Sequence, residues 1–106
     1  MLNLTAGQLS RFVRDDTNGA RDECGGNRRS AVEKIARPLT QASHLLVQAG
    51  TAVREKKLHK KLTQTRRAVL RAEKQLAKRR ATLSPACLAS FDPAIGRART
   101  GLSCLP

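Results

Sequence analysis

Aromatic residues, which normally provide much of the buried area in a small domain, are nearly missing from this chain. Its 106 residues include two phenylalanines, Phe12 and Phe91, and neither tryptophan nor tyrosine. We therefore expect a thin core and a chain that is not an independent compact globule, with tertiary order that depends on a partner. The same scarcity argues against single-strand nucleic-acid recognition by base stacking.

Cysteines are few and widely spaced, at Cys24, Cys87 and Cys104. No C-x-x-C pair occurs, and neither His44 nor His59 lies at a ligand-like offset from a cysteine. Zinc sites and disulfide frameworks need tighter patterning, so we expect no metal, no cofactor and free thiols in a reducing intracellular compartment. A Cys87–Cys104 bridge is the alternative, and cytoplasm and organelle matrix both stay open as locations.

The chain has no long apolar run, because the longest strongly apolar stretch is Leu45-Leu46-Val47. A bilayer span needs about 20 such residues. Membrane-surface helices need bulky side chains on their buried face, whereas the apolar residues here are interspersed with alanine and threonine. We expect no membrane partner.

Acidic residues number only eight, and four of them cluster at Asp15, Asp16, Asp22 and Glu23 without a histidine nearby. A solvated acidic patch explains such a cluster better than a metal site does. Cys24 has no identifiable base beside it, so nucleophilic catalysis lacks a basis. We expect a protein that is not an enzyme and has no catalytic residues.

Positive charge is what the chain has in abundance, with a formal net charge of +13. Most of it lies in one run, residues 54–80, which contains twelve lysines and arginines and only two acids, both glutamates. We predict that these cations bind nucleic acid: Arg54, Lys56, Lys57, Lys60, Lys61, Arg66, Arg67, Arg71, Lys74, Lys78, Arg79 and Arg80.

Neither glutamate of this run is in register with a cation. Glu55 and Glu73 have no lysine or arginine three or four positions away, where helical neighbours pair. The basic side chains are therefore left for an external polyanion. Phosphates spaced along a nucleic-acid backbone suit charges that are spread over several helical turns.

An apolar stripe follows the same run at helical spacing. We predict that it contacts another helix of the chain or a neighbouring protein subunit, through Leu58, Leu62, Val69, Leu76 and Leu83. Thr65 and Arg79 interrupt the heptad pattern, and Lys61 would face Arg66 in a parallel pair. A homodimeric coiled coil is therefore not expected.

The helix signals predict an all-α protein of two to three helices, dominated by one long basic helix. In the first segment, 1–29, Thr5 and Gln8 fit a capping box that opens a short helix to about Arg14, and a Gly- and Asp-rich loop is expected over 17–29. The last segment, 84–106, is rich in proline and glycine and is expected to form an irregular tail.

The middle segment, 30–83, is the predicted long basic helical region. Ser30 and Glu33 fit a second capping box at its start. Pro38 is expected to kink or restart the helix, and Gly50 is a second candidate hinge. Whether the two halves form one kinked helix or a hairpin stays open.

The leading functional interpretation is a non-enzymatic protein that binds structured RNA, as a small structural subunit of a ribonucleoprotein such as a ribosome. Recognition would rest on shape and backbone contacts. Three alternatives remain: an accessory DNA-binding protein, a helical module that binds an acidic protein, and a translated frame that was never selected for a fold.

Overall fold

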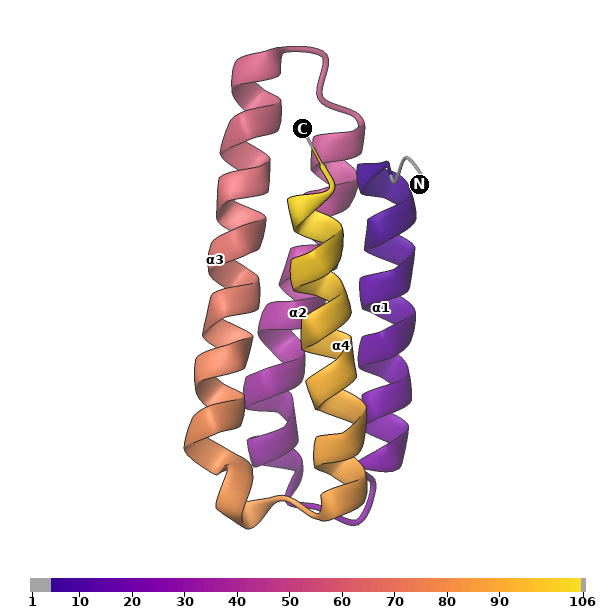
Figure 1. Ribbon diagram of the computed structural model, residues 1–106, viewed down its shortest axis with the longest axis vertical. Helices are drawn as coiled ribbons and strands as arrows, with labels where there is room; N and C mark the ends of the chain where they lie inside the picture. Colours follow the sequence, from indigo (N-terminus) through magenta and orange to yellow (C-terminus); the bar gives the residue numbers. More distant parts are fainter. Residues whose placement is uncertain (1–4, 106) are drawn as a thin grey trace.

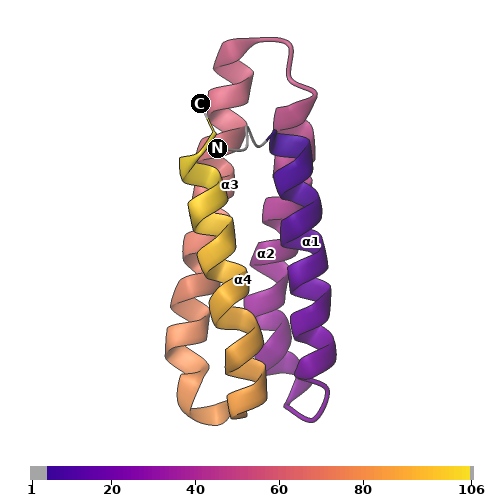
Figure 2. The same ribbon diagram turned by 45° about the vertical axis from the view of Figure 1, so that its right-hand side comes forward.

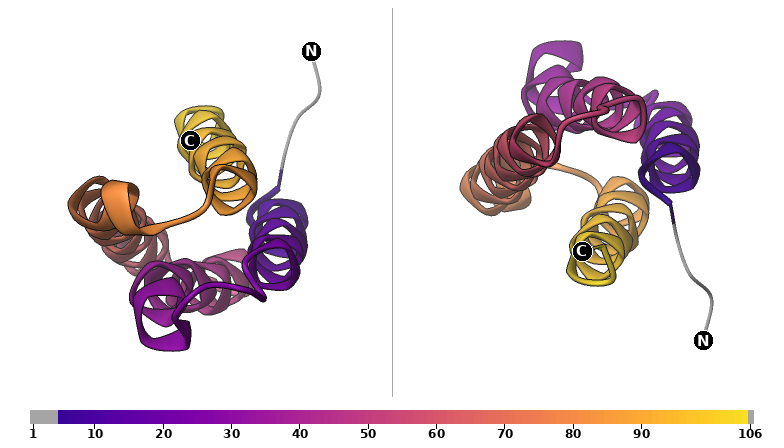
Figure 3. Two further views of the ribbon diagram at one scale, coloured as in Figure 1. Left: turned by 90° about the horizontal axis from the view of Figure 1, so that it is seen from below. Right: turned by 90° about the horizontal axis from the view of Figure 1, so that it is seen from above.

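A computed structural model describes residues 5–105, which form four α-helices and no strand. The helices run alternately up and down, and in the end-on views they lie around a quadrilateral in chain order (Figures 1 and 3). A short 3-10 turn, η1 (Arg80–Thr82), follows the third helix. The helices are α1 (Ala6–Glu23), α2 (Arg29–Gly50), α3 (Glu55–Arg79) and α4 (Pro85–Ser103).

The predicted all-α class is confirmed, but the expectation of two to three helices without a compact fold is wrong. The helices enclose a shared core of leucine, isoleucine, valine, alanine and cysteine side chains around Phe91, which is fully buried. Alanines such as Ala36, Ala42, Ala68 and Ala72 are also fully buried. Small side chains at these positions let helix axes approach closely, so the bundle forms a dense core with one aromatic residue.

Helix α1 begins at the predicted capping box. The Thr5 hydroxyl accepts a hydrogen bond from the Gln8 amide at 3.1 Å, and the Gln8 side chain accepts one from the Thr5 amide at 3.0 Å. The helix does not end near Arg14, because it continues to Glu23. The predicted loop over 17–29 is therefore wrong for its first seven residues, and residues 1–4 of the predicted first segment lie outside the described part.

Burial explains this continuation of α1. Thr17 and Ala20 lie in the core, and the Thr17 hydroxyl donates to the Val13 carbonyl at 2.6 Å. Asn18 and Gly19, which signal a turn in the sequence, lie on the exposed face. Packing of one helical face outweighs the weak intrinsic propensity of exposed positions.

Helix α2 passes through Pro38 without interruption, so the predicted restart at this residue is wrong. Ile35 and Leu39 are buried on either side of it and hold both turns against the core. Arg28 is the N-cap, which replaces the capping box expected at Ser30. Gly50 is the last residue of α2, so the basic region is a helical hairpin rather than one long helix.

The expected irregular tail is also wrong, because most of it forms α4 (Figure 1). Ser84 caps this helix by accepting from the Cys87 amide at 3.2 Å, and Pro85 occupies the first turn. Helical spacing places a set of apolar side chains in the core: Cys87, Phe91, Ala94, Ile95, Ala98 and Leu102.

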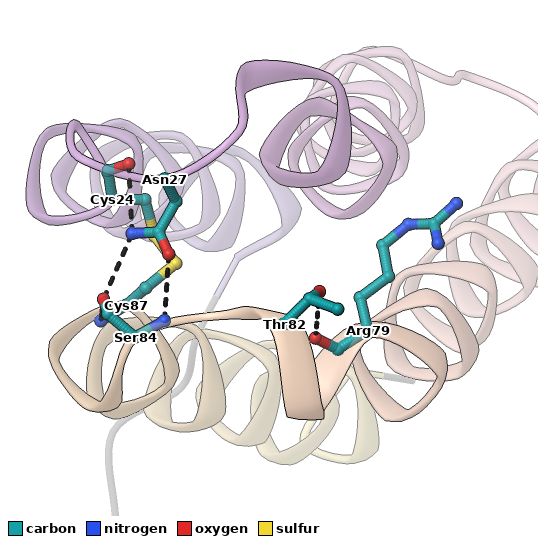
Figure 4. The surroundings of a disulfide bond; sticks show 6 residues. All are labelled: Cys24, Asn27, Arg79, Thr82, Ser84 and Cys87. Carbon is teal, nitrogen blue, oxygen red and sulfur yellow. Dashed lines mark hydrogen bonds between the residues drawn. A yellow bond between two sulfur atoms is a disulfide. The ribbon is translucent and has the colours of Figure 1, made fainter.

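A disulfide between Cys24 and Cys87 replaces the free thiols expected at these positions (Figure 4). The two Cα atoms are 4.6 Å apart, and both side chains are buried. Beside the bond, Asn27 accepts from the Ser84 amide at 2.9 Å and donates to its hydroxyl at 3.1 Å. Cys104 is a free, exposed thiol, so the alternative Cys87–Cys104 bridge is not formed.

Candidate nucleic-acid interface

The apolar stripe of α3 determines which cations point outward. Leu62, Val69, Leu76 and Leu83 are buried within the chain, and Leu58 is half-buried against the same core. Packing on α2 and on the rest of the bundle thus accounts for the stripe. Thr65, which interrupts the heptad pattern of the stripe, is fully buried, and its hydroxyl donates to the Lys61 carbonyl at 2.8 Å. The opposite face of α3 is left for solvent.

Six of the predicted cations share that opposite face. All are exposed, and helical spacing of 3.6 residues per turn aligns them over about 33 Å of α3. This outer row consists of Lys56, Lys60, Arg67, Arg71, Lys74 and Lys78. Such a row presents positive charge at intervals along a straight line, as a phosphate backbone does with negative charge.

Helix α2 extends the outer row sideways. The Arg71 guanidinium donates to the Gln41 side chain of α2 at 2.8 Å, and both residues line a shallow pocket with Arg67. Nearer the start of α2, Arg28 and Lys34 face the end of α3 across a second pocket. We call the outer row and these two α2 residues the basic face.

The remaining predicted cations lie at the margins of this face. Arg54 and Lys57 are exposed near the α2–α3 loop, and Lys61 is half-buried. Arg66 lies on the side of α3 that faces α4, in a groove with Arg99. Arg79 is half-buried at the end of α3, and Arg80 follows in η1.

One of the twelve cations is neutralised, which the sequence did not indicate. Arg80 forms two hydrogen bonds to the Asp92 carboxylate of α4, at 2.7 and 3.1 Å. This pairing lowers the pKa of Asp92 through the hydrogen bonds and raises the pKa of Arg80. Arg80 is therefore the predicted contact that is least available to an external anion.

Two acids of α2 and α3 are paired with cations of the other two helices. Glu73 of α3 accepts from Arg99 of α4 at 2.8 Å. Glu33 of α2 is held by Arg21 of α1 at 2.9 Å. Within residues 5–105, no ion pair involves a cation of the outer row.

The α2–α3 hairpin projects beyond the ends of α1 and α4 (Figures 1 and 2). Its loop, residues 51–54, joins Gly50 to the first turn of α3 and carries Arg54. Lys56 and Lys57 follow directly and are exposed. Glu55, in the same turn, has its carboxylate 3.6 Å from His59. The bundle thus has a basic tip as well as a basic face.

Other kinds of site have little support among the described residues. No group of three or more histidine, cysteine, aspartate or glutamate side chains there is arranged to hold a metal ion. None of the four helices combines the length and apolarity that a membrane crossing requires.

Sequence reasoning identified the cations of α3 but missed Arg28 and Lys34. Both lie outside the dense run, more than thirty residues from the α3 positions that they face. The antiparallel return of α2 along α3 brings them there. Recognising Gly50 as a helix end would have been the one sequence signal for this placement.

No protein-family model matches the chain, and neither curated proteins nor solved structures give a significant match.

Proposed function

We propose that the protein binds structured RNA through the basic face and tip of its α2–α3 hairpin, as a non-enzymatic structural subunit of a ribonucleoprotein. The observation that carries this proposal is the outer row of α3, whose six exposed cations have no acidic partner in the described structure. Unpaired charge of this density favours association with a polyanion.

Two features favour nucleic acid over an acidic protein. The outer row follows one line along α3, which matches phosphates better than the irregular carboxylates of a protein surface. Leu62, Val69 and Leu76, which a helical interaction module would present to its partner, are buried inside the bundle.

The projecting tip favours a folded RNA over a straight duplex. A DNA duplex would meet the basic face along one line, whereas a folded RNA can contact the face and the tip from different directions. Without tryptophan or tyrosine to stack on bases, recognition rests on backbone and shape. An accessory DNA-binding role is the alternative outcome of a direct competition between the two nucleic acids.

Salt dependence of binding to an RNA hairpin with a helical junction is the first test. If about six phosphates are contacted, a plot of log affinity against log salt has a slope of roughly −4 to −5. A slope near zero would refute the proposal. Stronger competition by duplex DNA than by the RNA would favour the DNA-binding alternative.

Two variants that each remove one positive charge locate the binding surface. Arg67→Gln removes one cation from the outer row, so it should reduce the magnitude of the salt slope by about one. Arg11→Gln is the matched control, because Arg11 is exposed on α1, which lies diagonally opposite α3 (Figure 3). Equal effects of the two variants would show that net charge, rather than the basic face, drives binding.

A further inference from the structure

A basic pocket of about 430 Å³ lies between the start of α2 and the end of α3. Two of its cations, Arg28 and Lys34, come from the α2 side, and two, Lys78 and Arg79, come from α3. None of the four pairs with a carboxylate among residues 5–105. Four like charges around one concavity repel each other unless an anion lies between them.

Arg79 supplies an independent indication that an acceptor belongs in this pocket. Its Nε atom is buried and has no hydrogen-bond partner. Its main chain is held in place, because the Thr82 hydroxyl donates to the Arg79 carbonyl at 2.8 Å, and its side chain points away from the disulfide (Figure 4). A buried donor without a partner is unfavourable. Because the half-buried Arg79 side chain lines the pocket, a rotation of that side chain would bring the donor to an anion there.

The start of α2 adds to the positive potential of the pocket. Arg28 is the N-cap and forms no side-chain cap, in contrast to Thr5 on α1 and Ser84 on α4. The first amides of a helix carry partial positive charge, and here they lie beside a pocket that Ser30 also lines. The hydroxyl of Ser30 is a further hydrogen-bond donor.

The pocket differs in chemistry from the outer row. An internal phosphodiester carries one negative charge and is flanked by sugars on both sides. A phosphate monoester carries about 1.5 to 2 negative charges and has three free acceptor oxygens. Four converging cations in a concave site suit the second group, because arginine forks and lysine ammonium groups can reach all three oxygens.

We propose that the pocket formed by Arg28, Lys34, Lys78 and Arg79 binds a phosphate monoester. The group is either the terminal phosphate of a nucleic-acid strand or that of a small phosphorylated molecule. The first source rests on the proposed RNA-binding function, and the second does not.

The test compares one RNA hairpin carrying either a 5′-phosphate or a 5′-hydroxyl, at constant ionic strength, and compares adenosine 5′-monophosphate with adenosine. One charge-assisted contact is worth about tenfold or more in affinity. We expect at least about this preference for the 5′-phosphate. If the source is a small molecule instead, the nucleotide binds in preference to adenosine, and the two RNA ends bind alike.

Variants assign the preference to the pocket. Lys34→Gln alters only an exposed residue of α2, so its folding is not at risk, and Arg79→Gln removes the buried donor. Both should reduce the preference for the phosphate toward unity. Arg67→Gln, on the outer row, should weaken both RNAs equally and keep their ratio.

Each outcome separates the pocket from the proposed function. RNA binding with no preference for either phosphate-bearing probe would overturn the proposed phosphate site and leave the RNA-binding proposal intact. Binding of the nucleotide without RNA binding would overturn the RNA-binding proposal and leave the proposed phosphate site intact. A preference that persists in both Lys34→Gln and Arg79→Gln would show that the phosphate binds elsewhere and would also overturn the pocket.

Discussion

Cys24, directly after α1, is covalently bonded to Cys87 in the first turn of α4, although 63 positions separate them in the sequence. The bond encloses the whole α2–α3 hairpin in a covalent loop and joins the two helices that lie on either side of it. The loop restricts the unfolded chain far more than the folded one, because the folded bundle already holds the two sites together.

Reduction of this bond should therefore lower the free energy of unfolding by about 2–4 kcal/mol. Urea denaturation with and without dithiothreitol measures the difference. Cys104→Ser is the control, since this exposed thiol lies outside the bond and its replacement should leave both curves unchanged. Alkylation of three thiols in the unreduced, denatured protein would contradict the pairing.

Gly101→Ala should destabilise the bundle by about 1–3 kcal/mol. A Cβ atom at this buried position would collide with the side chain of Leu9, which is fully buried between α1 and α4. Thermal unfolding monitored by circular dichroism measures the loss.

Gly96→Ala is the matched control on the same helix, because a Cβ atom there meets nothing within 4 Å. Alanine is the better helix former, so this variant should gain about 0.5–1 kcal/mol. The two substitutions thus have opposite expected signs, and equal effects would show that α1 and α4 do not pack as described.

Leu62→Ala should cost about 2–5 kcal/mol of stability, because it leaves a cavity in the core at a side chain that is 1% exposed. Leu70→Ala, at a side chain of α3 that is 49% exposed, should cost about 1 kcal/mol or less. Urea titrations of both variants measure the contrast. A non-cooperative transition in the wild-type protein would instead support a chain that was never selected for a fold.

Acid should weaken the contact between Arg80 and Asp92. Hydrogen bonds from Arg80 lower the pKa of Asp92 in the folded protein below its unfolded value of about 3.9. The contribution of the pair is therefore present above that unfolded value and is lost as the pH falls through the lower, folded-state pKa. Asp92→Asn should lose less stability than wild type between about pH 5 and about pH 2. Parallel urea midpoints over this range would contradict the prediction.

The strongest sequence patterns led to correct elements. The leucine spacing of α3 predicted a helix with one buried face, and Thr5 with Gln8 predicted the start of α1. Both signals are local, since they depend on residues within a few turns of each other. The leucine spacing also indicated which cations of α3 point outward, because it assigned the buried side of the helix.

Local signals failed where packing overrides them. Pro93, Gly96 and Gly101 predicted an irregular tail, yet this segment is helical because Phe91 and Ile95 are buried among the other helices. The propensity cost of a glycine in a helix is about 1 kcal/mol. Burial of one large apolar side chain contributes more than that, about 1.5–3 kcal/mol.

The sequence by itself determined that the protein is helical, strongly basic and short of stacking residues, because composition and periodicity are properties of the chain alone. Only the tertiary structure decided that Cys24 meets Cys87 and that Arg28 and Lys34 join the cations of α3. These are distances between residues far apart in the chain, and they depend on the order in which four helices pack around one core. The same packing buries the apolar stripe of α3 and pairs Glu73 with Arg99 of α4. The cations on the opposite side of α3 are thereby left together on one exposed face.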